Sequence, residues 1–135
     1  MAGYSATPLW KKLGYKDGLT AHVESAYDSY LGDLQLPADV RITWAKQPTC
    51  SVQFIHVFAT SKLTLDAKLR SFRNIIAPDS VIWVSWPKKS SGLATDITED
   101  TVREIALPLG FVDIKVCAVT EVWSGLKLVV RKELR

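Results

Sequence analysis

The fold is decided by the stretch VIWVSWPKKSSGLATDITEDTVREIALPLGFVDIKVCAVTEVWSGLKLVV, residues 81–130. It opens with an apolar run at 81–86, which suits a buried strand, and continues through a polar loop into a helix. Two further strand patterns, 112–122 and 126–131, follow with no helix between them, so we expect a hairpin around Trp123-Ser124-Gly125. The stretch therefore predicts an α/β sheet whose last strand runs antiparallel.

The residues before this stretch alternate between strand and helix patterns. The nearly continuous apolar run at 52–59 is typical of a central parallel strand that is covered on both faces. Over residues 62–76, apolar side chains recur at steps of three and four, which predicts an amphipathic helix. The other expected elements are a short helix opened by Thr7-Pro8, strands at 19–24 and 40–45, a helix at 26–34 and a helix capped by Thr98.

These elements predict one domain, residues 1–135, with a three-layer α/β fold, because right-handed crossovers place helices on both faces of a parallel sheet. We expect about six strands. Only residues 46–51 separate the second and third strands, which is too short for a crossover helix. The strand from Val40 to Ala45 would be an exposed edge, so a homodimer through it is one hypothesis for a partner.

The composition is that of an ordinary globular domain, with 47% hydrophobic and 23% charged residues. The net charge of +3 permits an anionic ligand, whereas nucleic-acid binders usually concentrate far more positive charge, so nucleic acid is disfavoured as a partner. No apolar run approaches about 18 residues, so no membrane contact is expected. Cys50 and Cys117 are far apart and lack metal-ligand spacing, and a reducing, cytoplasmic location is the default expectation.

Several short motifs resemble those of a small bacterial family of unknown function. The N-terminal residues Gly3, Tyr4, Ser5, Thr7, Pro8 and Leu9 match its Gly-Tyr-Ser-x-Thr-Pro-Leu stretch. Further matches are Ile82-Trp83-Val84-Ser85-Trp86-Pro87-Lys88-Lys89, Thr95-Asp96-Ile97-Thr98-Glu99-Asp100, Ile114-Lys115-Val116-Cys117-Ala118-Val119 and Trp123-Ser124-Gly125-Leu126-Lys127. The resemblance implies a shortened, methyltransferase-like Rossmann fold, for which we expect the strand order 2-1-3-4-6-5 with the last strand antiparallel. It brings no established activity with it.

Two expected cofactor-binding features are missing. A methyltransferase that uses S-adenosylmethionine (SAM) needs a glycine-rich turn after its first strand and an acid at the end of its second strand for the ribose hydroxyls. Here the first turn is Glu24-Ser25-Ala26-Tyr27-Asp28, with no glycine before Gly32, and the second strand ends Trp44-Ala45-Lys46. Both departures fall on the same ligand. We therefore predict no SAM binding, and we assign no cofactor and no catalytic residue.

Ligands of open α/β sheets bind beside the carboxyl ends of the strands, where we expect the loop after residue 86 to meet the hairpin turn. Lysines there would supply charge, hydroxyls would donate hydrogen bonds, and indoles would form an apolar wall for a small anionic ligand. The alternative is a solvated loop that caps the next helix and locks the hairpin. The candidate ligand-binding residues are Trp86, Lys88, Lys89, Ser90, Trp123 and Ser124.

Two further clusters have competing interpretations. His22 and His56 fall on strands that would be neighbours, but no third ligand has a recognisable spacing, so we expect partly buried histidines and no metal site. The helix at 62–76 carries a basic face, which suits phosphate groups but is equally typical of a solvated surface. The residues of that face are Lys62, Lys68, Arg70 and Arg73.

The leading interpretation is a non-catalytic or degenerate methyltransferase-like domain that binds a small anionic ligand or a protein partner. The alternatives are a transferase with an altered cofactor site and a nucleic-acid accessory domain that uses the basic helix. The sequence alone assigns no reaction, because one fold can carry many chemistries.

Overall fold

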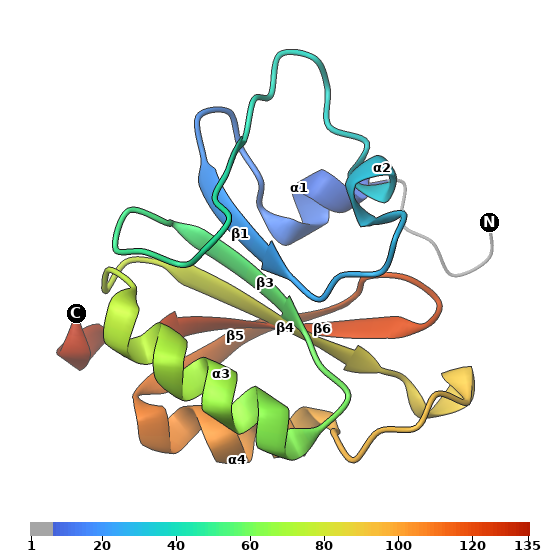
Figure 1. Ribbon diagram of the computed structural model, residues 1–135, viewed down its shortest axis with the longest axis vertical. Coiled ribbons are helices and arrows are strands. Elements are labelled where there is room, and N and C mark those ends of the chain that lie inside the picture. The colour runs from blue at the N-terminus through green and yellow to red at the C-terminus, as the bar shows by residue number, and fades with distance from the viewer. Residues whose placement is uncertain (1–6) are drawn as a thin grey trace.

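The computed structural model describes residues 7–135, which form a six-stranded sheet with helices on both faces (Figure 1). The sheet has the order β2-β1-β3-β4-β6-β5, and only β6 runs antiparallel to its neighbours. The predicted order and the antiparallel last strand are confirmed. The motif residues Gly3, Tyr4 and Ser5 lie outside the described residues. The strands are β1 (Thr20–Glu24), β2 (Thr43–Trp44), β3 (Phe54–Phe58), β4 (Val81–Pro87), β5 (Phe111–Ala118) and β6 (Trp123–Val130).

Two pairs of helices cover the sheet, with α1 and α2 on one face and α3 and α4 on the other (Figure 1). None of the helices among residues 7–135 is long and apolar enough to cross a membrane. The α-helices are α1 (Leu9–Leu13), α2 (Tyr30–Leu34), α3 (Lys62–Ile75) and α4 (Glu99–Ala106), and the short 3-10 helices are η1 (Lys89–Ser91), η2 (Leu107–Leu109) and η3 (Lys132–Leu134).

Helix α3 confirms the helix that the spacing predicted. The side chain of Ser61 accepts a hydrogen bond from the backbone N–H of Thr64, which satisfies one of the donors that the first turn leaves unpaired. Leu65, Leu69 and Phe72 form its buried stripe against the sheet. Burial of each of these side chains contributes about 1.5–3 kcal/mol, so packing and not helix propensity holds α3 in place.

Side chains alternate across the central strand β3, so the sheet carries a core on each face. Ile55 and Val57 join the apolar cluster under α3 and α4. Phe54 and Phe58 join the cluster under α1 and α2, and the His56 ring stacks on Phe58. All five residues of β3 are buried, as the continuous apolar run predicted.

The first half of the chain is more reduced than the sequence predicted. Strand β2 comprises only Thr43–Trp44 and not residues 40–45, because Val40 instead closes a turn by donating its N–H to the carbonyl of Pro37. Helix α2 begins at Tyr30 and not at residue 26, since a turn at 27–30 precedes it. Strand β2 lies at the edge of the sheet, as predicted. So short an edge resists pairing, and dimerisation through it stays a prediction.

The hairpin turn is also displaced from its predicted place. The turn lies at residues 119–122, and Trp123, Ser124 and Gly125 belong to β6. A Cβ on Gly125 would lie 3.1 Å from Val119 Cγ2 and 3.3 Å from Trp83 Cε3. The glycine therefore permits close packing inside the sheet rather than a turn.

Candidate functional site

The carboxyl ends of β1 and β3 lie side by side where the connections of the sheet diverge, because β1 leads outward to β2 and β3 leads the other way to β4. Open α/β sheets bind ligands at such a switch point. A crevice of about 220 Å³ lies there, walled by hydroxyl groups and two aromatic rings. Its lining residues are Ser25, Phe58, Ala59, Thr60, Ser61, Thr64 and Trp123.

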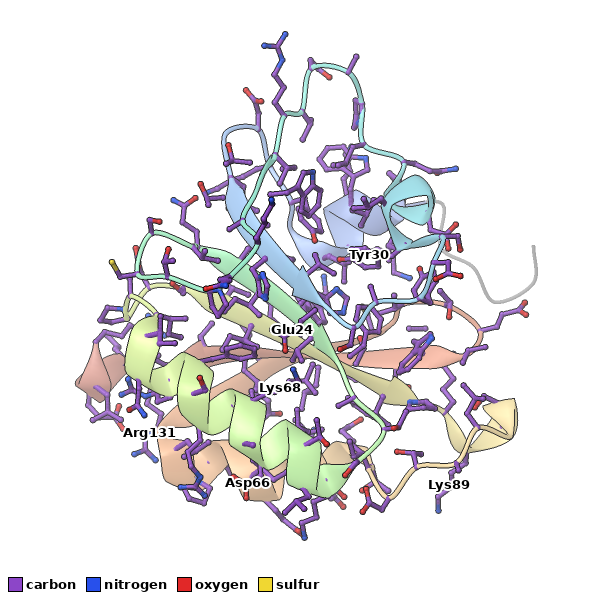
Figure 2. All side chains as sticks on the ribbon, viewed as in Figure 1. Glu24, Tyr30, Asp66, Lys68, Lys89 and Arg131 are labelled. Atoms are coloured by element: carbon purple, nitrogen blue, oxygen red, sulfur yellow. The ribbon has the colours of Figure 1, made fainter. Side chains whose placement is uncertain are left out.

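Glu24, the last residue of β1, is held by two internal contacts. One carboxylate oxygen lies 2.9 Å from Nε2 of His22, and the other forms an ion pair with Lys68 of α3. Figure 2 shows Glu24 and Lys68 pointing toward each other between β1 and α3. Nδ1 of His22 lies 2.9 Å from the carbonyl oxygen of Ala45, so both ring nitrogens of His22 have a polar partner. The end of β1 is thus tied to the sheet and to α3.

Ser25, the next residue, has a φ of +62°. This left-handed conformation favours glycine, and a residue with a Cβ adopts it at a cost of about 1 kcal/mol. The turn therefore has a glycine-like backbone at the place where a cofactor-binding turn would carry a glycine. The serine side chain lines the crevice in its stead.

Aromatic rings fill the space below the crevice on the α1 and α2 face. The Phe58 ring makes edge-to-face contacts with Tyr27, Tyr30 and Trp123, with ring centroids 5.8, 5.4 and 5.2 Å apart. Such contacts add about 0.5–1.5 kcal/mol per pair to the burial of the rings. The chain's own side chains therefore form a packed floor at the switch point.

A buried chain of hydrogen bonds runs from this floor across the sheet. The hydroxyl oxygens of Tyr15 and Tyr30 are 2.8 Å apart, and Tyr30 Oη lies 2.7 Å from His56 Nδ1. His56 Nε2 lies 2.8 Å from Ser85 Oγ. Sequence analysis missed this chain, because its four members come from α1's C-terminal turn, α2, β3 and β4 and share no spacing in the sequence.

The Ser85–His56–Tyr30 arrangement has the connectivity of a nucleophile, a base and an orienting group. However, Ser85 and His56 are completely buried, so no substrate reaches the serine. Burial lowers the pKa of His56 from 6.5 to about 3, which keeps the ring neutral. Burial also holds the pKa of Tyr30 well above its usual value. The chain is therefore a structural network that joins α2 to the sheet.

A second cavity of about 350 Å³ opens at the ends of β1 and β2. Trp44 stands where a SAM-binding strand would end in an acid, so the wall is aromatic at that point. The cavity's single carboxylate, Asp28, belongs to the loop before α2. Its lining residues are Val23, Ala26, Tyr27, Asp28, Tyr30, Leu31, Trp44 and Ala45.

The two tryptophans predicted to line one cleft lie on opposite faces of the sheet. Trp86 pairs with Ser124 and is buried in the core under α3 and α4. Trp123 pairs with Pro87, one position along, and packs on the α1 and α2 side. Because side chains alternate along a strand, this register separates the two indoles, and only Trp123 lines the crevice at the switch point.

The loop after β4 is tied to its surroundings by its own polar groups. Lys88 donates its backbone N–H to the carbonyl of Val122, and Thr95 donates its hydroxyl to the carbonyl of Thr60. The carboxylate of Asp96 accepts the backbone N–H of Lys62, so it caps α3. Lys89 and Ser90 are exposed, and Figure 2 shows Lys89 far from Glu24. These contacts match the alternative interpretation of a loop that locks a helix and the hairpin.

The two histidines do not form a pair. His22 aligns with Ile55 on the α3 and α4 face, whereas His56 aligns with Trp83 on the opposite face. Within residues 7–135, no group of three histidine, cysteine or acidic side chains could hold a metal ion.

The basic residues of α3 are engaged by groups of the same chain. Lys68 pairs with Glu24, Arg70 pairs with Asp66 at 3.0 Å, and Arg73 donates to the carbonyl of Leu109. Lys62 lies 4.0 Å from Glu104. A surface of this kind offers little unpaired charge to a phosphate backbone.

Comparison with solved structures identifies the fold. A SAM dependent methyltransferase from Aquifex aeolicus is similar over 90% of this chain and 87% of its own, with a TM-score of 0.65 and 14% identity. Magnesium protoporphyrin IX methyltransferase from Synechocystis PCC 6803, with bound SAM, is similar over 91% of this chain and 74% of its own (TM-score 0.57, 12% identity). A TehB-like SAM-dependent methyltransferase from Corynebacterium glutamicum is similar over 96% and 91% (TM-score 0.55, 8% identity).

At such identities the likeness shows the fold alone. The chain has a methyltransferase-like Rossmann fold, in agreement with the resemblance seen in its sequence. No protein-family model matches the sequence, and no curated protein is significantly similar to it.

Proposed function

We propose that this chain is a methyltransferase-like domain that has lost SAM-dependent methyl transfer and acts by binding. The observation that carries the proposal is the state of the carboxyl end of β1. Glu24 is engaged by His22 and by Lys68, and the next residue is a serine in the conformation of a glycine. A cofactor would have to displace these contacts before it could approach the backbone.

The size of the crevice supports the same conclusion. Its volume of about 220 Å³ lies below the range of about 300–1,000 Å³ that is usual for organic ligands. The rings of Tyr27 and Trp123 each pack against the Phe58 ring beneath it, so enlarging the crevice would break aromatic contacts. Access for a whole nucleoside is therefore costly.

Calorimetric titration with SAM tests the proposal. We expect no saturable heat at physiological SAM concentrations, and a thermal melt in the same buffer would show that the protein is folded. A micromolar dissociation constant would contradict the proposal.

A domain that binds and does not catalyse a reaction would have either a small anion or a protein as its partner. A small anion is favoured by the loop after β4, where Lys88 and Lys89 carry charge close to the η1 turn and Ser90 is exposed. A nucleic-acid accessory function gains no support, since the basic residues of α3 are paired within the chain.

A transferase with an altered cofactor site is the second candidate, and the cavity at the ends of β1 and β2 favours it. The cavity of about 350 Å³ falls within the usual range for ligands, and Trp44 offers a flat apolar wall. Adenosine is a suitable probe: saturable binding that Trp44→Ala abolishes would support this function, and no binding would count against it.

A further inference from the structure

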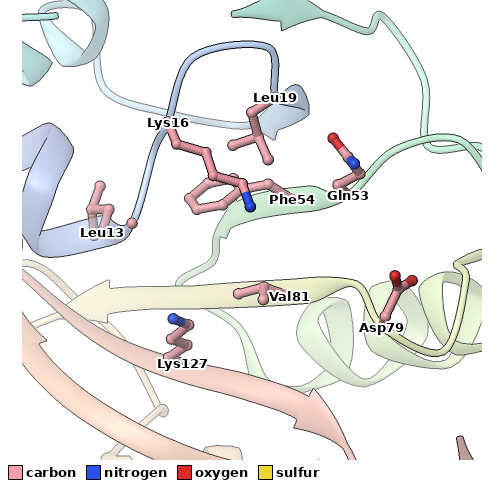
Figure 3. A pocket seen from close by; sticks show the side chains of 9 residues that line it. Leu13, Lys16, Leu19, Gln53, Phe54, Asp79, Val81 and Lys127 are labelled. Atoms are coloured by element: carbon pink, nitrogen blue, oxygen red, sulfur yellow. The ribbon is translucent and has the colours of Figure 1, made fainter. Parts of the chain in front are cut away.

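A separate cavity lies at the opposite end of the sheet, beside the start of β3 and β4 (Figure 3). Its volume is about 270 Å³, and it is bounded by the end of α1 and by the middle of β6. The floor is apolar, while both ends of the cavity carry polar groups. The lining residues are Leu13, Gly14, Lys16, Leu19, Gln53, Phe54, Asp79, Val81 and Lys127.

Lys127 is the unusual member of this set. It pairs with Trp83 in the sheet, so its side chain rises from a strand face that is otherwise apolar, and it is only partly exposed. A Cβ on Gly14 would lie 3.8 Å from its ammonium nitrogen, which places Nζ close to the backbone at the end of α1. No carboxylate among residues 7–135 forms an ion pair with it. Burial, together with the charge of Lys115, lowers the pKa of Lys127.

Lys16 faces the same space from the opposite wall. It lies in the turn between α1 and β1, and Figure 3 shows its ammonium group and that of Lys127 directed toward the centre of the cavity. Lys16 also has no carboxylate partner among the described residues. Lys115, which pairs with Lys127 across β5 and β6, adds a further positive charge beside this end of the cavity.

The far end of the cavity differs in character. Asp79 and Gln53 stand there, and Asp79 makes no ion pair with either lysine among residues 7–135. Gln53 accepts the backbone N–H of Thr20 through Oε1 at 3.1 Å, which leaves its amide N–H groups to donate. The cavity therefore has a cationic end, an apolar floor and a mixed polar end.

We propose that this cavity binds a small oxyanion, a carboxylate or phosphate group, between Lys16 and Lys127, with the rest of the ligand on Phe54 and Val81. An oxyanion there would accept charge-assisted hydrogen bonds from both ammonium groups, and it would offset the positive charge that Lys115 places beside Lys127. The volume limits the ligand to a small molecule. The site is remote from the crevice at the carboxyl ends of β1 and β3, so the proposal goes beyond the loss of SAM binding and does not depend on it.

The test is an NMR titration of protein with ¹³C-labelled lysine side chains, using inorganic phosphate in one arm and sodium acetate in the other. Sodium chloride replaces the probe at matched ionic strength. We expect saturable shifts of the Lys127 and Lys16 signals, and the arm with the lower dissociation constant distinguishes phosphate from carboxylate. Lys127→Met and Lys16→Met should each weaken binding about tenfold or more, since each removes one charge-assisted hydrogen bond.

Lys46→Met is the matched control, because Lys46 is exposed and does not line the cavity, so the variant should leave the titration of Lys16 and Lys127 unchanged. Met keeps the aliphatic stem of Lys127, and Lys16 is exposed, so both variants should fold. The proposal is overturned if Lys16→Met and Lys127→Met bind phosphate and acetate as the unmodified protein does. It is also overturned if the lysine signals follow ionic strength alone.

Discussion

The two halves of the sheet differ in how completely they are built. Strands β4 and β6 have 7 and 8 residues, and α3 has 14, with an apolar core between them. Strand β2 has 2 residues and α2 has 5, and the core on their side contains a buried polar chain. The β1–β2 half is thus built from shorter elements than the rest of the sheet. The comparison teaches that the fold depends on β3, β4 and β6, and that the β1–β2 half is held by specific contacts.

The largest expected effect comes from a tryptophan of the long strand β4, whose side chain packs in the core under α1 and α2. Trp83 is fully buried and donates its indole N–H to the carbonyl of Leu13 at 2.7 Å, so it joins α1 to the sheet. Trp83→Ala should lower the free energy of unfolding by about 3–5 kcal/mol in urea denaturation. Trp44→Ala is the matched control; that side chain is 39% exposed, so the loss should be less than half as large. Equal losses of unfolding free energy in the two variants would contradict the expected difference between the two parts of the sheet.

The buried polar chain gives the next effect. Tyr30→Phe keeps the ring but leaves Tyr15 Oη and His56 Nδ1 without their partner, which should cost about 1–3 kcal/mol. Tyr15→Phe removes the end of the chain and leaves only one group unpaired, so it should cost less. Thermal and urea unfolding of both variants would check this order, and the reverse order would show that the network is not what holds α2.

Acid should weaken the β1–β2 half through His56. The pKa of His56 is about 3 in the folded state, below the ordinary value of 6.5. As the pH falls below 6.5, this histidine therefore binds a proton in the unfolded chain but stays neutral in the folded chain. Stability is therefore lost between pH 6.5 and about 3, by about 2 kcal/mol at pH 5 from this group. His56→Gln should flatten the pH dependence of unfolding in this window. An unchanged slope would contradict the assignment.

A smaller effect is expected at the turn after β1. Ser25→Gly relieves a left-handed conformation at φ +62° and should raise the free energy of unfolding by up to about 1 kcal/mol. Because the aromatic rings below the crevice remain, the variant should still show no SAM binding in calorimetry. Restored SAM binding would show that the missing glycine alone accounts for the loss.

The smallest effect is expected in the loop after β4. Lys88→Ala with Lys89→Ala should change the melting temperature hardly at all, since Lys89 is exposed and Lys88 uses its backbone rather than its side chain in the loop. Differential scanning calorimetry would check this. A loss of several degrees, with no anion binding by the loop, would make the lysines structural.

The complete half was also the half that the sequence predicted well. The apolar run of β3 reflects burial on both faces of the strand, and the spacing of apolar residues in α3 reflects burial of one stripe of the helix. Both patterns can be recognised within a short stretch of sequence. Thr98 was recognised as a cap because capping depends on residues three apart. The strand order followed from the resemblance to a methyltransferase-like fold, and the handedness of the crossovers placed the helices on both faces of the sheet.

The failures have a different physical origin. The sequence could not show on which face of the sheet Trp86 and Trp123 lie. Packing sets the register of β4 against β6, and a register shift of one residue moves every side chain of a strand to the other face. Gly125 suggested a turn, although it serves the close approach of Trp83. The hydrogen-bonded chain through His56 unites residues that are far apart in sequence. The residues that line the cavity at Lys127 are also far apart in the sequence, so the sequence did not predict this cavity.

The central claim is that the carboxyl end of β1 is closed to the cofactor by the chain's own side chains. An NMR titration of ¹⁵N-labelled protein with S-adenosylhomocysteine tests it most directly, because it reports binding and its location together. The account predicts that the amide signals of Ser25, Thr60 and Ser61 do not move up to millimolar ligand. Saturable shifts of these three signals at micromolar ligand would contradict it.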